Sequence, residues 1–295
     1  MNERNSTTRS QNAASQLDER TGAPAAVYPD ASASSRRSAS RTRRARYLLP
    51  LAALVAACVS VPITGRSAFV PFPVEQDSPL GAEAYDEILQ GEQEIKSGPQ
   101  VQMVNRVMDR LVAAAKKMNI DPGFDWEVRV LKADDVPNAW ALPGGKMAVY
   151  TGILPITQNE AGLAVVMGHE LSHAIARHGA ERMGQQLVQQ SVLEGVNLVR
   201  PDWAEYAELG VIGFDLLVSR PWGRGQESEA DHIGLFLMAE AGYDPREAVA
   251  FWERMSSMTG GGGGPEWLST HPSHGTRIAD IKALLPEVLP IYEGS

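Results

Sequence analysis

A pair of histidines four residues apart lies within an apolar helical pattern in the middle of this chain. His169, Glu170 and His173 form the sequence H-E-x-x-H. In an α-helix, positions i and i+4 lie about 40° apart around the axis and about 6 Å apart along it, so both imidazoles can reach one metal ion. The carboxylate of Glu170 then lies beside the metal rather than on it, where it can take a proton from a water molecule.

The start of this helix can also be predicted. Residues 157–160 (Thr-Gln-Asn-Glu) fit a capping box, and Pro155 separates them from the preceding strand. The alternative interpretation is a surface helix with two histidines that occur there by chance, because a five-letter motif also arises without function. A third ligand elsewhere in the chain would distinguish the two interpretations.

The best candidate for that ligand is Glu227. A catalytic zinc site needs three protein ligands and leaves its fourth position to water. Glu227 and Asp231 are four residues apart on a predicted helix, so they share one face. Glu227 can complete the site while Asp231 accepts a hydrogen bond from the far nitrogen of a liganding histidine and fixes its tautomer. Glu229 is expected to point elsewhere. An E-x-x-x-D pair alone is usually a solvated helix face, so this assignment depends on the H-E-x-x-H motif.

The other histidines differ in their predicted roles. His178 lies five residues after His173, about 140° around the helix, and is expected to be a structural hydrogen-bonding group. Gly179 stands where the longer metzincin pattern requires a third histidine, which excludes that pattern. His232 is expected to face away from the site. His271 follows five consecutive glycines at 260–264 and precedes a proline, and it is placed near the metal.

The first 57 residues have the character of an export signal. Residues 1–46 contain nine arginines, no lysine and four acids, and residues 47–57 are an apolar run of about half the ~20 residues that span a bilayer. Cys58, the only cysteine, ends a sequence that resembles the lipobox of bacterial lipoproteins, so Cys58 is a predicted lipidation site. A buried free cysteine is the alternative. The residue after Cys58 is Val59 and not an aspartate, which in lipoproteins of this kind implies the outer membrane.

Charge excludes one class of partner. Residues 1–57 hold nine of the 27 basic and four of the 36 acidic residues, so the remainder has 18 basic and 32 acidic residues and a net charge of −14. Nucleic acid is therefore not expected as a partner, because its binding requires a basic face.

Periodicity predicts a mostly helical chain with a small sheet. Residues 58–80 read as a lipidated N-terminus and tether, and residues 81–295 as one domain. Asn138 and Ala139 begin a segment, 138–142, that is followed by a proline and two glycines. Such a segment favours a sheet edge, where backbone groups can pair with an extended peptide, although an ordinary hairpin loop is the alternative. The predicted strands are 126–131 and 146–151, and the predicted helices besides the metal helix are 81–96, 99–118, 181–199, 202–218, 226–241, 244–258 and 278–285.

With these motifs in view, residues 60–285 resemble the HtpX, BepA and LoiP group of bacterial zinc metallopeptidases, which are gluzincins related to the CAAX prenyl proteases. The resemblance does not extend to the membrane spans of HtpX or to the C-terminal repeats of BepA. Gly223 stands where a serine is usual before Arg224. The motifs that carry the resemblance are Asn138-Ala-Trp with Pro143-Gly-Gly, His169-Glu-Leu-Ser-His173 with Arg177-His178 and Glu181-Arg182, Arg224 through Asp231, and Thr270-His-Pro-Ser with Arg277.

The resemblance implies an α+β, mostly helical zincin-type domain with a small antiparallel sheet whose edge strand, with Asn138 and Ala139, holds substrate. It implies that Glu227 is the third zinc ligand and Asp231 its supporting acid. His271 matches a histidine that can occupy the open zinc position and keep the enzyme latent, and Arg277 matches an active-site arginine.

The expected function is zinc-dependent endopeptidase activity with one Zn²⁺ per chain, in which Glu170 removes a proton from water and returns it to the leaving amine. The expected substrates are unfolded or misassembled envelope proteins, and the expected location is the periplasmic side of a Gram-negative outer membrane, with a lipid anchor at Cys58. The alternative is a periplasmic chaperone or assembly factor in which zinc is mainly structural or the site is latent.

Overall fold

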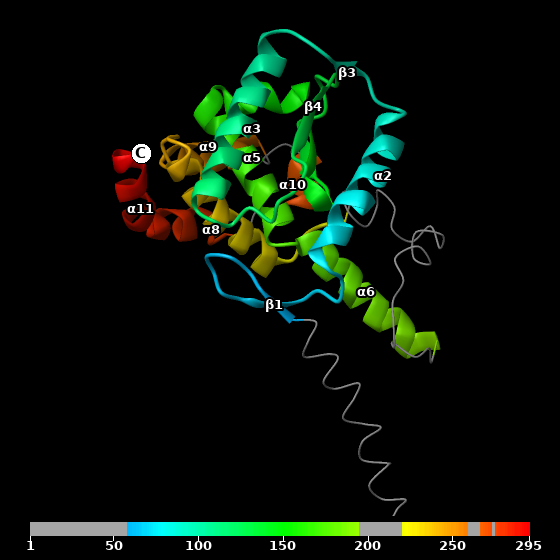
Figure 1. Cartoon of the computed structure of the whole chain (residues 1–295). Helices are drawn as coiled ribbons and strands as arrows, with labels where there is room; N and C mark the ends of the chain where they lie inside the picture. The colour runs from blue at the N-terminus through cyan, green and yellow to red at the C-terminus, as the bar shows by residue number, and fades with distance from the viewer. Residues whose placement is uncertain (1–57, 195–219, 259–265, 273–274) are drawn as a thin grey trace, which may run out of the picture. The chain divides into compact units, whose positions relative to one another are not determined.

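The computed structural model describes residues 58–194, 220–258, 266–272 and 275–295, all of which belong to one unit, Leu49–Ser295 (Figure 1). The predicted signal segment 1–57, the predicted helix 202–218 and the five glycines at 260–264 lie outside the described residues.

The central sheet has four strands in the order β3-β4-β6-β5. These are β3 (Glu94–Ile95), β4 (Glu127–Leu131), β6 (Lys146–Tyr150) and β5 (Ala139–Ala141). β5 lies at an edge, as predicted. The expectation of an antiparallel sheet is wrong for one pairing, because β4 and β6 are parallel. The chain leaves β4, forms β5 on the outside and returns through a tight turn in which Gly144 has φ 78° and Gly145 has φ 91°, so β6 is inserted beside β4 in the same direction.

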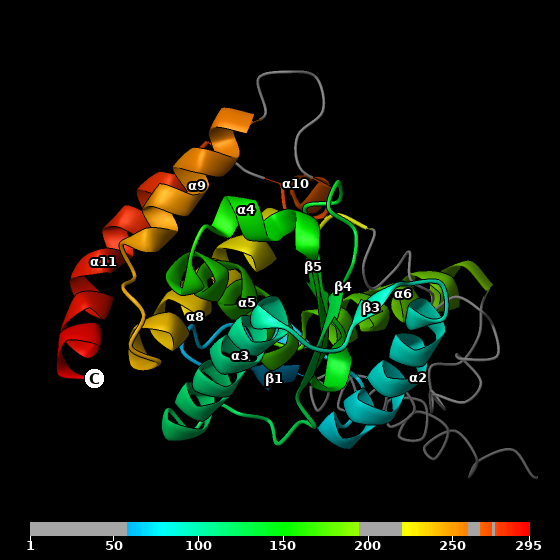
Figure 2. The ribbon, with the colours of Figure 1, turned by 90° about the horizontal axis from the view of Figure 1, so that it is seen from above.

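Helices cover this sheet, and α5 lies in the middle of the molecule between the sheet and α8 (Figure 2). α3 packs on both α5 and β4, while α9 and α11 lie side by side beyond α8. The helices are α2 (Asp77–Leu89), α3 (Pro99–Lys117), α4 (Leu154–Thr157), α5 (Glu160–Ile175), α6 (His178–Glu194), α8 (Arg224–Glu240), α9 (Glu247–Ser257), α10 (Glu266–Thr270) and α11 (Arg277–Gly294), with short 3₁₀ turns at Val74–Gln76, Pro143–Gly145 and Thr151–Ile153.

Two of the predicted helices differ from the structure by more than one helical turn at one end. The helix predicted over 81–96 is α2, which begins at Asp77 and ends at Leu89, before β3. The helix predicted over 278–285 is α11, which continues to Gly294 through Pro286 and Pro290. A proline removes one intrahelical hydrogen bond, but burial of apolar side chains on one face of α11 overrides that local cost.

The segment predicted to be a tether is part of the folded unit. β1 (Cys58–Ser60) and β2 (Ser67–Phe69) form an antiparallel pair, and β2 contacts α6. Ala68, Val70 and Phe72 alternate along the chain and are buried, together with Val61. This period of two places one face of the segment in the core. We call residues 58–72 the N-terminal hairpin.

The predicted cap of the metal helix is displaced by two residues. Thr157 ends α4, and the side-chain oxygen of Asn159 accepts a hydrogen bond from the backbone N–H of Gly162 at 2.9 Å. Pro155 is the second residue of the single turn of α4 and does not separate a strand from α5, and Gln158, with φ 64°, lies between the two helices.

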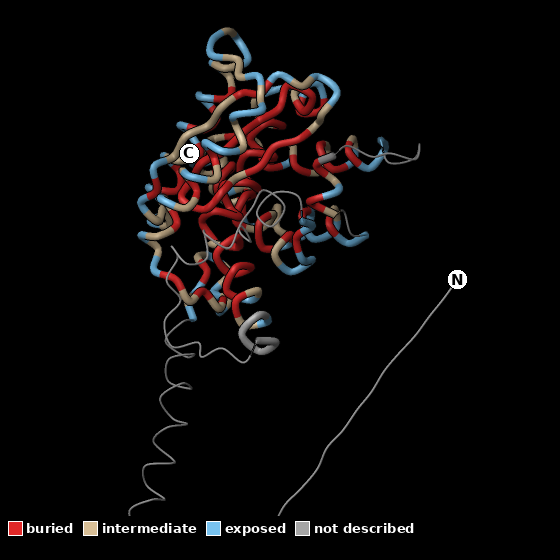
Figure 3. Tube along the Cα trace, turned by 90° about the vertical axis from the view of Figure 1, so that its right-hand side faces the viewer, coloured by how far each residue is buried: buried red, intermediate tan, exposed pale blue. Residues whose placement is uncertain are grey.

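α5 is buried on every side. Each of its residues from Gly162 to Ile175 is buried, and Figure 3 shows buried residues running through the middle of the described unit. A helix buried all round places its polar side chains in the core, where each must find a partner. Among the helices that the structure describes, none is long and apolar enough to cross a membrane.

Candidate metal centre

α5 and α8 bring the two halves of the predicted site together. His169, Glu170 and His173 are each 2% exposed in the middle of α5, and Glu227 in the first turn of α8 is fully buried. The helices meet at Gly168 and Gly234, where a Cβ atom added at Gly234 would lie 3.2 Å from the carbonyl carbon of Gly168. Glycine at both positions permits this close backbone approach without displacement, and the approach sets the distance between the histidines and Glu227.

The three predicted ligands have the spacing of a zinc site. The Nε2 atoms of His169 and His173 are 3.1 Å apart, and Glu227 places its carboxylate oxygens 3.6 Å from the first and 3.3 Å from the second. Ligand atoms bound tetrahedrally about 2.1 Å from zinc are about 3.4 Å apart. The N and O atoms of this set therefore fit one zinc ion.

His271 lies at the same cluster. Its Nδ1 atom is 3.1 Å from Nε2 of His169 and 3.0 Å from Oε1 of Glu227, and the potential ligand atoms of all four residues lie within 4.8 Å of one another. The predicted placement of His271 near the metal agrees with this geometry. Its role as an inhibitory fourth ligand stays a prediction.

Glu170 lies beside the cluster, apart from the ligand set. Its Oε1 atom accepts a hydrogen bond from the indole N–H of Trp267 at 2.8 Å and lies 3.3 Å from Nε2 of His271. Trp267 is fully buried in α10 and was not singled out from the sequence. One short segment, 266–272, therefore contacts both the ligand cluster and the candidate base.

Asp231 and Arg277 surround the ligands as a second layer of contacts. Asp231 Oδ1 is 2.9 Å from Nδ1 of His169, the partner predicted for it. Arg277 is fully buried, donates to Asp231 at 2.7 Å and to Glu227 at 2.6 Å, and lies 3.6 Å over the ring of Trp252. The predicted active-site arginine thus contacts the carboxylates of the site, and its positive charge compensates theirs.

His178 occupies a position that helical spacing did not predict. α5 ends at Ile175, Arg177 adopts φ 56°, and His178 begins α6, so its place is not the 140° rotation expected from a continuous helix. Its Nδ1 atom lies 2.8 Å from Nδ1 of His173, and its Nε2 atom 2.9 Å from Glu229. The expected hydrogen-bonding role of His178 is confirmed, whereas its partners come from the turn. His232 faces away and stacks on Phe236.

The buried surroundings set the protonation states of the site. Burial lowers the pKa of His173 well below its ordinary value, and burial also lowers the pKa of His178. Burial raises the pKa of Glu227, but His271 and His169 outweigh it and hold that pKa far below its ordinary range. Burial likewise raises the pKa of Asp231, and Arg277 and His169 outweigh it. Burial lowers the pKa of His169, but Glu227 and Asp231 outweigh it and raise that pKa to about 9. Neutral His173 and ionised Glu227 are the forms that bind zinc, whereas His169 must release a proton when it binds the metal.

The edge strand begins close to the site. Asn138 and Ala139 are buried, and the backbone N–H of Ala139 donates to the side-chain oxygen of Asn138 at 2.9 Å. The backbone N–H of Trp267 donates to Pro137 O at 3.1 Å, so the segment that contacts Glu170 also adjoins the start of β5. Substrate binding by Asn138 and Ala139 stays a prediction.

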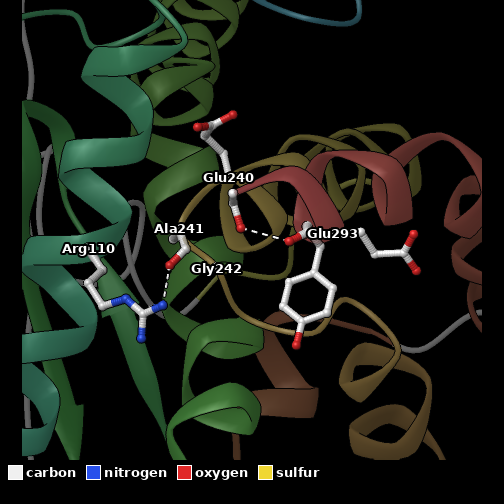
Figure 4. A pocket seen from close by; sticks show the side chains of 7 residues that line it. Arg110, Glu240, Ala241, Gly242 and Glu293 are labelled. Carbon is white, nitrogen blue, oxygen red and sulfur yellow. Dashed lines mark hydrogen bonds between the residues drawn. The ribbon is translucent and has the colours of Figure 1, made fainter.

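One pocket among the described residues lies away from the candidate ligands. A cavity of about 500 Å³ lies between α3, the end of α8 and the end of α11, and its walls include Arg110, Glu240 and Glu293 (Figure 4). None of the candidate ligands lines it, so it is not the site of the chemistry.

Comparison with known proteins identifies the family. The sequence profile of peptidase family M48 matches residues 100–285, which include every candidate ligand and Glu170. The chain belongs to peptidase family M48. As an M48 peptidase it is a metalloendopeptidase that uses zinc, and the cluster of His169, His173, Glu227 and His271 is where one ion fits. The resemblance stated from the motifs is confirmed at the level of this family.

Similar M48 proteins include mitochondrial and bacterial proteases. The mitochondrial metalloendopeptidase OMA1 of Schizosaccharomyces pombe is 36% identical over 77% of this chain and 66% of its own length. The mitochondrial metalloendopeptidase OMA1 of Homo sapiens is 32% identical over 79% of this chain and 47% of its own. The beta-barrel assembly-enhancing protease of Escherichia coli is 27% identical over 79% of this chain and 48% of its own. The chain thus spans between about half and two thirds of these relatives.

These comparisons contradict the predicted location. A place on the periplasmic side of a Gram-negative outer membrane was expected, but the relatives with the higher identities carry names that place them in mitochondria. The error came from interpreting Val59 and the preceding apolar run by bacterial rules alone. Lipidation of Cys58, which is exposed at the start of β1, remains a prediction.

Proposed function

We propose that this M48 peptidase cleaves unfolded or misassembled proteins, with Glu170 as the base and His169, His173 and Glu227 as the zinc ligands. The observation that carries the proposal is the position of Glu170. Its carboxylate is buried next to the ligand atoms and has a hydrogen-bond donor of its own in Trp267. A carboxylate held there without being a ligand is placed to move protons.

Zinc, when bound, supplies Lewis-acid chemistry, which polarises a carbonyl group and lowers the pKa of water. Glu170 accepts a proton from the attacking water and returns it to the leaving amine. Trp267 orients one oxygen of Glu170 through its indole N–H, which leaves the other oxygen for the proton. Asp231 accepts from Nδ1 of His169 and so keeps the Nε2 lone pair directed at the cluster.

The proposed substrate is an extended chain that adds to the free edge of β5. Within the described sheet, β5 pairs with β6 on one side only. An extended peptide that pairs with the free side uses main-chain hydrogen bonds, which do not depend on its sequence. Access of this kind favours unfolded segments over folded proteins.

The proposed location follows the relatives. Their names favour a mitochondrial site, and residues 1–46, rich in arginine and serine and poor in acids, have the composition of a transit peptide. Lipidation at Cys58 would instead require bacterial-type processing. Mass spectrometry of the mature N-terminus distinguishes the two, because only lipidation adds acyl mass to Cys58.

The deciding experiment compares Glu170→Gln with wild type. The variant should bind one zinc ion but digest casein at least about 100-fold more slowly, because the ligands remain while the base is lost. Glu247→Gln, which alters a carboxylate of the surface pair with Arg254, is the control and should keep full activity. Zinc-loaded Glu170→Gln that digests casein at the wild-type rate would refute the assignment. A wild-type protein that binds zinc without chelator-sensitive digestion would support the chaperone alternative.

A further inference from the structure

The two histidines of the metal motif are supported differently. His169 places its Nδ1 atom 2.9 Å from a carboxylate, that of Asp231. His173 places its Nδ1 atom 2.8 Å from another histidine, His178, which in turn lies 2.9 Å from Glu229. On its Nδ1 side, His173 therefore reaches a carboxylate only through the imidazole of His178.

Metal binding by His173 determines which nitrogen donates and which accepts in these two hydrogen bonds. A histidine that presents the Nε2 lone pair to a metal carries its proton on Nδ1, so His173 donates to Nδ1 of His178. His178 must then accept at Nδ1 and carry its own proton on Nε2, which donates to Glu229. The carboxylate of Glu229 is thus linked to His173 through His178, and the hydrogen bonds require one tautomer of each histidine.

The far end of this chain of contacts is held by the N-terminal hairpin. Glu229 is 5% exposed and accepts hydrogen bonds from Thr64 and, at 2.7 Å, from Nε of Arg66. Both residues lie between β1 and β2. The hairpin therefore pairs the buried carboxylate of Glu229 with a hydroxyl group and a guanidinium group.

Arg66 also joins α6, which follows α5 in the chain, to α8, which carries Glu227. Its Nη1 and Nη2 atoms donate to Glu181 of α6 at 2.7 and 2.8 Å, while its Nε donates to Glu229 of α8. Glu181 accepts a further hydrogen bond from Gln226 at 3.1 Å. The bidentate pair with Glu181 fixes the orientation of the Arg66 guanidinium group. Its Nε atom is thereby placed to hold Glu229 against His178.

We propose that His178, Glu229 and Arg66 are positioning residues for the zinc ligand His173, and that through them the N-terminal hairpin sets the zinc affinity of the site. Hydrogen bonding from a ligand histidine to a carboxylate raises the basicity of the ligand and fixes its ring, and loss of such contacts weakens metal binding about 10- to 100-fold. The proposal rests on the zinc site and is independent of the peptidase reaction.

The test measures zinc affinity of the full chain by competition with a fluorescent chelator. Glu229→Gln keeps the shape of the side chain but removes its charge, and we expect its zinc dissociation constant to rise about 10- to 100-fold. Arg66→Met should raise it about tenfold, and Arg66→Lys, which keeps the charge without the bidentate geometry, should recover part of that loss. The side chain of Arg66 is 36% exposed, so its replacement leaves no buried cavity.

Arg129→Met is the matched control. Arg129 is 33% exposed and also contacts two carboxylates, Glu127 and Glu94, on the sheet away from the cluster. Its loss should leave zinc affinity unchanged, and melting of the metal-free proteins reports any general loss of stability. The proposal is overturned if Glu229→Gln and Arg66→Met bind zinc within about twofold of wild type, or if Arg129→Met weakens binding equally. Peptidase activity enters neither outcome, so failure here leaves the assignment of Glu170 standing.

Discussion

Replacement of Arg277 by methionine should destabilise the protein strongly. The guanidinium is fully buried and compensates two carboxylates, Glu227 at 2.6 Å and Asp231 at 2.7 Å. Removal of one partner of a buried ion pair costs about 3–5 kcal/mol, because a charge is left buried without compensation. In a domain of this size each kcal/mol lowers Tm by about 2–4 °C, so we expect a fall of about 6–20 °C.

The assay is thermal unfolding followed by circular dichroism, with zinc and with excess chelator. The fall should be larger with chelator, because zinc itself neutralises part of the charge on Glu227. Arg254→Met is the control: Arg254 pairs with Glu247 at 2.7 Å near the surface, where such a pair is worth about 1 kcal/mol or less. Equal shifts in the two variants would refute the argument that the buried charges need Arg277.

Three further predictions concern the surroundings of the site. His271→Ala should raise the initial rate on an unfolded substrate at matched zinc occupancy, because the imidazole no longer competes with water for the cluster; an equal rate would show that His271 neither blocks nor assists. Arg66 holds the pKa of Glu181 below its ordinary value of 4.5 despite burial, so the stability from ionised Glu181 is present above pH 4.5 and is lost as pH falls through the lowered pKa. Glu181→Gln should therefore lower Tm at pH 7 and have progressively less effect below pH 4.5; a constant difference would contradict this. Gly234→Ala should lower both Tm and zinc affinity, since its Cβ would lie 3.2 Å from the backbone N of His169, and an unchanged affinity would show that α5 and α8 need not be this close.

The ligand set could be predicted because its geometry is local. His169 and His173 share one helix, and Glu227 and Asp231 share another, so the 3.6-residue period alone placed each pair on a common face. The edge position of β5 followed from the proline and glycines after it. The two helices are joined by the contact of Gly168 with Gly234. This contact is tertiary and leaves no periodic pattern in the sequence, so it could not be predicted.

The support for His173 could not be predicted because it depends on a single backbone torsion. The left-handed conformation of Arg177 ends one helix and allows the next to begin at His178, before the start predicted at residue 181. Glu229 was expected to point away from the site and residues 58–80 were interpreted as a tether, so the contact between Glu229 and Arg66 was not predicted. Four prolines in residues 58–80 concealed the alternation of buried side chains that attaches this hairpin to the core.

The contact between Gly168 and Gly234 has a consequence for genetics. The backbones of α5 and α8 are in contact there, and a Cβ atom added at either glycine would lie within 3.3 Å of the backbone of the other helix. A damaging substitution at one of two packed side chains can be suppressed by a smaller residue at the other, but here neither position has anything left to remove. Screens for second-site suppressors of Gly234→Ala should therefore yield no change at position 168 and only general stabilisers distributed over the rest of the domain.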